Sequence, residues 1–303
     1  MTTTFIDWLT KKAKSDERII LLTADLGYSV VEKFANEFPD RFINVGVAEQ
    51  NMTGIAAGLA SDGMRPYTYS IGIFPTFRCA EQIRNDIDYH NLPVVNSMVG
   101  CGVAYGALGY THHAIQDIAL MRSLPNMMIA TPADPKEVLE ILNWHYLNPK
   151  PIYLRMHRSK NPVLHEKNVD LQPGSPIQLN LINKKNNEKN TCIVGIGSIL
   201  NKVLKMVETN NIPVYSMPLW GQSCRNQFIK ELSNFEKIIT IEDHLLDGGF
   251  SSWVMETAAI NNFKGKIIPT TLSLSNVGKV AKEETLLNFL FSDLEKNIAK
   301  CND

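Results

Sequence analysis

The chain has 303 residues, a length that holds two domains at about 150 residues each. Hydrophobic residues make up 44% and charged residues 20%, as in proteins with a packed core, so a mainly disordered chain is excluded. The 30 basic and 31 acidic residues give a formal net charge of -1, which provides no basic face for nucleic acid. A local basic pocket for a phosphorylated substrate is compatible with this balance.

The cysteines and the N-terminus bear on the compartment. Five cysteines, an odd number with wide spacing and no CxxC, argue against a disulfide framework or a zinc site and favour a reducing compartment. Residues 1–17 contain no long apolar run, so we expect no signal peptide. No segment approaches the ~18 apolar residues of a membrane span. These features predict a cytoplasmic protein that does not bind membranes.

Short apolar runs alternate with segments of helical periodicity through the first half of the chain. The apolar runs predict buried strands at Ile19–Thr23, Val94–Val99, Met127–Thr131 and Ile152–Met156. Apolar residues recur at helical spacing in Asn51–Ala60, Glu81–Asp88 and Lys136–Trp144. This alternation predicts an α/β fold with a mainly parallel sheet.

The pattern breaks after Arg158 and later resumes. Residues 161–190 contain several prolines, Gly174 and the polar run Lys184–Asn190, which predict a linker and a loop. Further strands are then expected at Thr191–Gly195, Val214–Met217, Ile238–Ile241 and Ile267–Ile268, with a helix from Ile199 to Val207. We therefore predict two α/β domains, at residues 1–165 and 186–303, joined by a linker at 166–185.

The most informative segment is Asn44–Ala60, NVGVAEQNMTGIAAGLA. Glu49 opens the predicted helix, and the small residues after it allow another backbone or helix to approach closely. Taken alone, Glu49 is most simply an acidic first-turn residue, which the helix dipole favours by about 0.3–1 kcal/mol. The motifs that follow it change this interpretation.

The string GVAEQNMTGIAAGLA resembles the pyrimidine-domain motif of the transketolase family of thiamine diphosphate enzymes. Further strings similar to the family follow in the expected order: FPTFRCAEQIRND (Phe74–Asp86), GYTHHAIQDIALM (Gly109–Met121), RSLPN (Arg122–Asn126), TPADPKE (Thr131–Glu137) and PIYLRMHR (Pro151–Arg158). In the second block, TIEDHLLDGGF (Thr240–Phe250) resembles the EDH…GG turn of the transketolase C-terminal domain. The resemblance covers nearly the whole chain. It implies a pyrimidine domain followed by a transketolase C-terminal domain.

The resemblance implies a cofactor site for thiamine diphosphate. Glu49 would hydrogen-bond N1′ of the aminopyrimidine and favour the imino form that removes the C2 proton, so that the thiazolium can act as an electron sink. Phe74 would stack on the pyrimidine ring. Arg78 and Gln82 lie four and eight residues further on, roughly on one helix face, and are assigned to the same cofactor site. From residue type alone, a core phenylalanine and an exposed helix arginine stay open as alternatives.

The resemblance also implies a substrate site. His112 matches the loop histidine that contacts a substrate oxygen, and His113, at a position where the family has glutamine, could compete for that role. Arg158, with Arg155 nearby, matches the arginine that binds the substrate phosphate, for which a guanidinium fork is suited. A structural histidine and a salt bridge at a domain boundary are the simpler alternatives.

Two departures from the family pattern limit the prediction. Leu108 stands where the family carries an acidic residue before the loop glycine, so the usual sugar phosphates are in doubt. The chain also has no GDG…N motif, which in the family holds Mg²⁺ and the diphosphate, so no metal ligand is assigned here. We therefore expect a partner chain that carries the diphosphate domain, in an α2β2 assembly. The helix after Glu49 is the expected contact face.

Three functions fit these observations. The first is a split transketolase subunit that moves a two-carbon ketol unit from a ketose, such as a sugar phosphate, to an aldehyde. The second is the β subunit of a 2-oxo acid dehydrogenase E1 component, which shares the domain order. The third is a non-catalytic regulatory subunit that has kept the fold. The EQIRND and THH…DIALMRSLPN strings favour the first, and intact Glu49 and Phe74 argue against the third.

Overall fold

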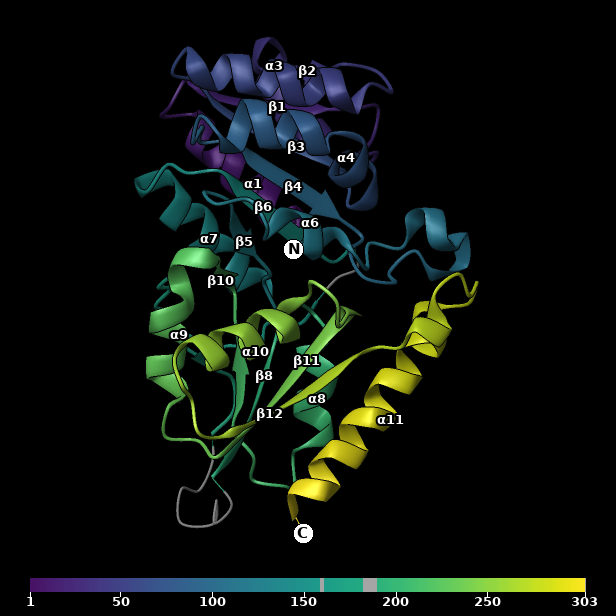
Figure 1. Ribbon diagram of the computed structural model, residues 1–303. Coiled ribbons are helices and arrows are strands. Elements are labelled where there is room, and N and C mark those ends of the chain that lie inside the picture. Colours follow the sequence, from purple (N-terminus) through teal and green to yellow (C-terminus); the bar gives the residue numbers. More distant parts are fainter. Residues whose placement is uncertain (159–160, 182–189, 303) are drawn as a thin grey trace.

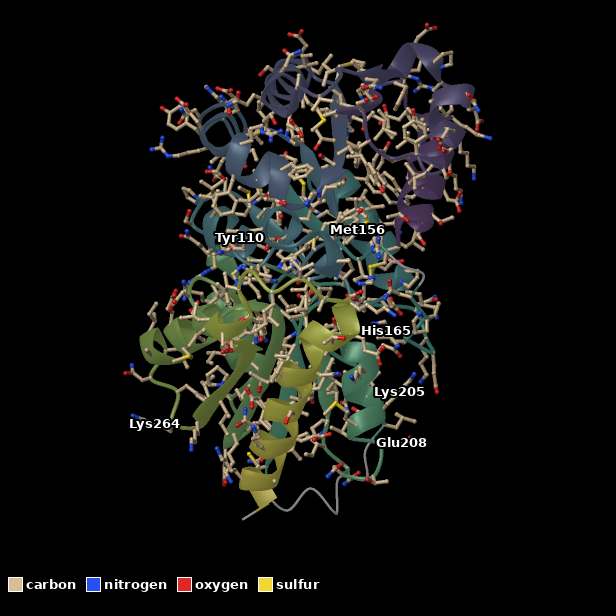
Figure 2. All side chains as sticks on the ribbon, turned by 90° about the vertical axis from the view of Figure 1, so that its right-hand side faces the viewer. Tyr110, Met156, His165, Lys205, Glu208 and Lys264 are labelled. Carbon is tan, nitrogen blue, oxygen red and sulfur yellow. The ribbon has the colours of Figure 1, made fainter. Side chains whose placement is uncertain are left out.

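The computed structural model describes residues 1–158, 161–181 and 190–302. Most of the predicted loop Lys184–Asn190 lies outside this range. The described chain forms two α/β domains stacked end to end, the first purple to teal and the second green to yellow (Figure 1). Tyr110 and Met156 lie near the level at which the two domains meet (Figure 2).

A seven-stranded sheet forms the first domain, with the order β10-β5-β6-β4-β3-β1-β2. All neighbours are parallel except the β10–β5 pair. The strands are β1 Ile19–Thr23, β2 Phe42–Asn44, β3 Arg65–Ile71, β4 Val95–Val99, β5 Met128–Ala130, β6 Ile152–Met156 and β10 Leu219–Trp220.

Helices cover both faces of this sheet, which explains why β1 is apolar at nearly every position. Leu21 packs in a cluster with Phe5 and Leu9 of one helix, whereas Leu22 packs with Met52 and other residues of another. The helices are α1 Thr2–Ala13, α2 Glu32–Glu37, α3 Glu49–Ser61, α4 Ile73–Arg78, α5 Ala80–Gln82, the π-helix Ile83–Asp88, α6 Asp117–Met121 and α7 Pro135–Leu147.

The second domain contains a five-stranded sheet with the order β12-β11-β8-β9-β7, parallel except for β7. Its strands are β7 Ile177–Gln178, β8 Thr191–Gly195, β9 Val214–Ser216, β11 Lys237–Leu245 and β12 Lys266–Leu272. Its helices are α8 Leu200–Met206, α9 Arg225–Leu232, α10 Phe250–Ile260 and α11 Glu283–Asn302. Helices α8 and α11 share one apolar cluster, and an aromatic cluster joins α9 to α10.

Two short strands pair differently from the predicted division into domains. Strand β7 falls inside the predicted linker and pairs with β9 of the second sheet. Strand β10 lies inside the predicted second domain but pairs with β5 of the first sheet, with Trp220 opposite Ile129. The two domains are therefore connected by sheet pairing as well as by the linker, and the boundaries themselves stay a prediction.

The predicted strands and helices coincide with observed elements, and the prediction of two mainly parallel α/β domains is confirmed. Several observed elements are not among the predicted ones, including strands β2 and β3 and helices α1, α9, α10 and α11. All five cysteines are buried and free. Within the described residues, no helix combines the length and the apolar character that crossing a membrane requires.

Candidate functional site

Four of the predicted site residues lie beyond the carboxyl ends of parallel strands, at one edge of the first sheet. Phe74 lies in α4, directly after β3, and His112 lies in the loop after β4. Arg158 follows β6, and Glu49 begins α3 shortly after β2. In parallel α/β sheets this edge is where ligands bind, so the fold brings together residues that are far apart in the sequence.

Glu49 is a buried carboxylate with one hydrogen-bonded oxygen. Its side chain is 3% exposed, although it stands in the first turn of α3. Arg78 Nη1 donates to Glu49 Oε2 at 2.6 Å, and the Arg78 backbone carbonyl accepts from Gln50 Nε2 at 2.9 Å. No hydrogen bond to Oε1 is found among the described residues. One carboxylate oxygen is thus available to a donor from outside the chain.

Arg78 and Phe74 connect Glu49 to the histidine loop. The Arg78 guanidinium, with its side chain 51% exposed, lies 5.8 Å from the centroid of the half-buried Phe74 ring. The Phe74 ring meets the His112 ring edge to face, with centroids 5.1 Å apart. Thr111 Oγ1 lies 3.0 Å from His112 Nδ1. A carboxylate, a cation, an aromatic ring and an imidazole therefore form one line of contacts.

Tyr105 extends this line to Arg158 and was missed by sequence reasoning. Its ring lies 6.2 Å from that of His112 and 4.9 Å from the Arg158 guanidinium carbon. The sequence feature that accompanies Tyr105 is Gly100 (φ +75°), because a Cβ at that position would lie 1.9 Å from the Tyr105 ring. The glycine after β4 is therefore needed for Tyr105 to fold back toward the site.

A cavity of about 310 Å³ opens beside Tyr105, and its lining includes Tyr28, Tyr69 and Arg158. Burial raises the pKa of both Tyr69 and Tyr105, so their phenols stay protonated near neutral pH. Among the described residues, neither hydroxyl has a hydrogen-bond partner. The cavity thus combines two free hydroxyl groups with an exposed guanidinium, a combination suited to an oxygen-rich or anionic ligand.

Three predicted site residues are not part of this line. His113 is buried, and its Nε2 donates to the Gly106 carbonyl at 3.3 Å inside the loop. Burial lowers the pKa of His113, and its ring faces the interior of the loop rather than the site. Arg155 is 2% exposed and paired with two carboxylates. The Oε1 atom of Gln82 is buried without a hydrogen-bond partner among the described residues, and it does not join the Glu49–Phe74 contacts.

The arrangement fits an aminopyrimidine ring. Such a ring presents N–H donors at its edge and an apolar face, and Glu49 offers a free acceptor oxygen close to the aromatic face of Phe74. The described residues contain no group of three or more His, Cys, Asp or Glu side chains that could hold a metal ion. This chain therefore presents groups for the ring, whereas its described part offers no ligand cluster for a cation.

The fold and the site define a pyrimidine-binding α/β domain joined to a second α/β domain. Residues 1–163 match the family described as "Transketolase, pyrimidine binding domain". The chain belongs to the transketolase family, and the resemblance predicted from its motifs is confirmed.

Relatives of similar extent support this membership. The chain is 31% identical over 234 residues to the B subunit of an apulose-4-phosphate transketolase from Actinobacillus succinogenes, covering 76% of this chain and 73% of the relative. It is 30% identical to a putative transketolase C-terminal section from Methanocaldococcus jannaschii, covering 96% and 92%. A 1-deoxy-D-xylulose-5-phosphate synthase from Methylobacillus flagellatus is 33% identical, but this chain spans 41% of its length.

Solved structures show the same architecture. A structure described as "Split gene transketolase, inactive beta4 tetramer" superposes with a TM-score of 0.81 at 28% identity, covering 98% of this chain and 96% of that one. A transketolase from Campylobacter jejuni superposes with a TM-score of 0.73 at 18% identity, and this chain covers 44% of it. The second match bears on the fold alone.

Proposed function

We propose that this chain is the subunit of a thiamine-diphosphate-dependent transketolase that contributes the pyrimidine domain and the C-terminal domain. The assembled enzyme transfers a two-carbon ketol unit from a ketose phosphate to an aldehyde acceptor. The observation that carries this proposal is the line of contacts from Glu49 through Arg78, Phe74 and His112 to Arg158. It joins a buried carboxylate to a cationic cavity along one sheet edge.

In this proposal each side chain has a separate task. Bound thiamine diphosphate supplies a nucleophilic carbon and an electron sink. Glu49 accepts a hydrogen bond from the pyrimidine edge and holds its tautomer, while Phe74 orients the ring by stacking. His112, whose ring meets that of Phe74 edge to face, contacts a substrate oxygen. Arg78, paired with Glu49, fixes the carboxylate until the cofactor binds.

The cavity beside Tyr105 is proposed to take the phosphate end of the donor. Arg158 lies at its edge and can pair with a phosphate dianion in a bidentate manner. The hydroxyls of Tyr69 and Tyr105 can donate to the same oxygens. Relatives named for apulose 4-phosphate and for 1-deoxy-D-xylulose 5-phosphate are consistent with a sugar phosphate. Leu108 is exposed, and its apolar side chain cannot accept a hydrogen bond from a sugar hydroxyl as an acidic residue would. The donor is therefore proposed to differ from the usual sugar phosphates in its hydroxyl contacts.

The chain is proposed to act only with a partner that carries the diphosphate and Mg²⁺ site, in a cytoplasmic α2β2 assembly. Relatives of similar extent, one named as a B subunit and one as a C-terminal section, support this requirement. Gly54 and Gly58 of α3 are exposed, and a Cβ at either position would meet no other atom within 4 Å, so a neighbouring helix could approach there. That face begins one turn after Glu49, close to the proposed site.

Titration calorimetry and a ketol-transfer assay test the proposal together. The isolated chain is expected to bind thiamine diphosphate very weakly and to show no ketol transfer, because one hydrogen bond and one stack do not offset immobilising a charged ligand. Co-purification with candidate partner chains, with Mg²⁺ present, is expected to restore both properties with saturable dependence on the partner. Micromolar, Mg²⁺-dependent binding by this chain alone would refute the divided site.

The same assembly separates the rival functions. Turnover of 2-oxo acids by decarboxylation, without ketol transfer, would favour the E1 β-subunit hypothesis. Stable assembly with the diphosphate partner but no thiamine-dependent turnover of any tested substrate would favour a regulatory subunit. Ketol transfer that is lost when thiamine diphosphate is omitted would support the proposed transketolase function.

A further inference from the structure

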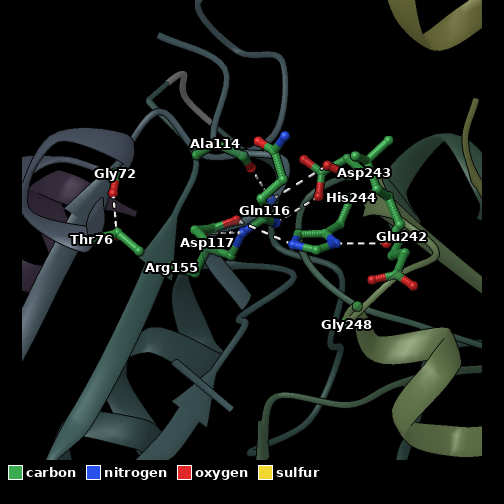
Figure 3. Close-up of polar contacts among 12 residues, drawn as sticks. Gly72, Thr76, Ala114, Gln116, Asp117, Arg155, Glu242, Asp243, His244 and Gly248 are labelled. Atoms are coloured by element: carbon green, nitrogen blue, oxygen red, sulfur yellow. Dashed lines mark hydrogen bonds and ion pairs between the residues drawn. The ribbon is translucent and has the colours of Figure 1, made fainter. Parts of the chain in front are cut away.

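A buried arginine connects the two domains directly behind the histidine loop. Arg155, in β6 of the first domain, donates through Nε to Asp117 Oδ2 at 2.9 Å. Its Nη1 donates to Asp243 Oδ1 at 2.6 Å, and Asp243 belongs to β11 of the second domain. All three side chains are almost completely buried, and Figure 3 shows Arg155 between the two carboxylates. The pairing therefore spans the domain interface without solvent.

This arginine also fastens the backbone that follows His112. Arg155 Nη2 donates to the Ala114 carbonyl at 3.0 Å, and Ala114 exchanges two backbone hydrogen bonds with Gly102. A Cβ at Gly102 would lie 1.9 Å from Asp243 Oδ2, so the loop backbone packs directly on that carboxylate. The backbone N–H of Leu245, two residues after Asp243, donates to Ile115. Strand β11 of the second domain thus contacts the loop at Gly102 through Asp243 and at Ile115 through Leu245.

The same network reaches the helix that carries Phe74. Tyr153 donates to Asp117 Oδ2 at 2.8 Å, and its hydroxyl lies 3.1 Å from Thr76 Oγ1 in α4. Thr76 in turn donates to the Gly72 carbonyl at the start of that helix. A chain of polar contacts therefore runs from the second domain, through Arg155 and the Tyr153–Thr76 hydroxyl contact, to both elements on which the Phe74–His112 contact depends.

We propose that Asp243 is a positioning residue of the active site: acting through Arg155, it holds the His112 loop in register with α4. This inference rests on the proposed function for its catalytic consequence, but not for its structural one. Removing one partner of a buried ion pair strongly destabilises the fold, because the other partner remains as an uncompensated buried charge. Removing the Asp243 charge therefore leaves Arg155 with Asp117 as its one carboxylate partner and disturbs the guanidinium that also donates to the Ala114 carbonyl.

A second interdomain ion pair provides a matched control. Glu256 of α10 accepts from Arg122, just after α6, in a bidentate arrangement at 2.7 and 3.0 Å. Glu256 is half-exposed, and among the described residues no hydrogen bond joins either partner to the loop between Gly109 and Gln116. The Glu256→Gln variant therefore weakens the domain interface without touching the loop that carries His112.

Hydrogen–deuterium exchange on the isolated chain tests the positioning role without any cofactor or partner. Asp243→Asn is expected to speed exchange of the Ala114 and Leu245 amides by about tenfold or more, whereas Glu256→Gln leaves both unchanged. Arg155→Lys is the second variant, in case Asp243→Asn does not fold. It keeps the positive charge but loses the guanidinium that joins both carboxylates and the Ala114 carbonyl, and it is expected to speed exchange of the same amides. Unchanged loop exchange in a folded Asp243→Asn or Arg155→Lys protein would overturn the inference.

A double-mutant cycle in the assembled enzyme tests the catalytic consequence. Asp243→Asn is expected to lower kcat about tenfold, with little change in KM, and to cause almost no further loss when His112 is already Asn. Equal losses in both backgrounds would show that Asp243 does not act through His112. If the wild-type assembly lacks ketol transfer, the proposed function fails, while the exchange experiment still decides whether Asp243 holds the loop.

Discussion

Replacing Glu49 by Gln separates the chemistry of the site from its stability. Gln keeps the size and shape of the side chain and can still accept from Arg78, but it cannot carry a negative charge. If Glu49 holds the pyrimidine tautomer, turnover of the assembled enzyme should fall by about 10²-fold or more, the range for acid–base groups. That factor corresponds to about 2.7 kcal/mol of transition-state stabilisation, at about 1.4 kcal/mol per tenfold.

The structure predicts a much smaller effect of this variant on folding. The lost ion pair joins a buried carboxylate to a guanidinium whose side chain is 51% exposed, and solvent screens such a pair to about 1 kcal/mol or less. Removing the charge also removes the desolvation cost of a carboxylate that is 3% exposed. The unfolding temperature should therefore change by only about 2–4 °C for each kcal/mol lost.

The assay is ketol transfer at saturating thiamine diphosphate and partner, with thermal unfolding of the same preparations. Glu256→Gln is the matched control, because Glu256 is also paired with arginine but lies away from the site. We expect wild-type turnover for the control and a large loss for Glu49→Gln at similar stability. Near wild-type turnover of an assembled Glu49→Gln enzyme would refute the assigned role.

Three further outcomes are expected. Arg158→Ala should raise KM for a phosphorylated donor at least about tenfold more than for its unphosphorylated analogue, and equal effects would make Arg158 structural. Gly58→Ala should stabilise the isolated chain by about 0.5–1 kcal/mol but weaken partner binding in calorimetry, since α3 presents open space there; unchanged affinity would exclude that face. Burial lowers the pKa of His145 to about 4, below its usual 6.5, so about 3 kcal/mol of stability should be lost as the pH falls from 6.5 to 4. Urea unfolding of His145→Gln should show a smaller loss, and an identical pH profile would contradict this sign.

Apolar runs predicted the strands well because both faces of each sheet are covered. The segments at β1, β4, β6 and β8 are buried at every position, so their sequences mark strands without alternation. Strand β3 has the same burial at its centre but was missed, because its sequence RPYTYSI is rich in polar groups. Hydrogen bonding of these groups inside the fold cannot be inferred from hydropathy.

Motifs located the site but could not tell neighbouring residues of one type apart. Arg155 and Arg158 lie three residues apart, yet one is inside β6 between two carboxylates and the other is exposed beyond the strand end. His112 and His113 are adjacent, yet one contacts Phe74 and the other points into the loop. In each case long-range partners decide the role, and those partners come from segments distant in the sequence.

In the EDHLLDGGF string of the second domain, contacts within the string and with the first domain explain why these residue types are present. Glu242 accepts from the backbone N–H groups of Phe250 and Ser251, which otherwise lack partners at the start of α10. Gly249 must lack a side chain, since a Cβ would lie 2.5 Å from the Glu242 carboxylate, and Gly248 packs equally closely on Ala119 of α6. The string therefore builds a helix start that rests on the first domain. This turn follows shortly after Asp243, which pairs with Arg155. The segment that begins α10 of the second domain therefore also supports the loop that carries His112.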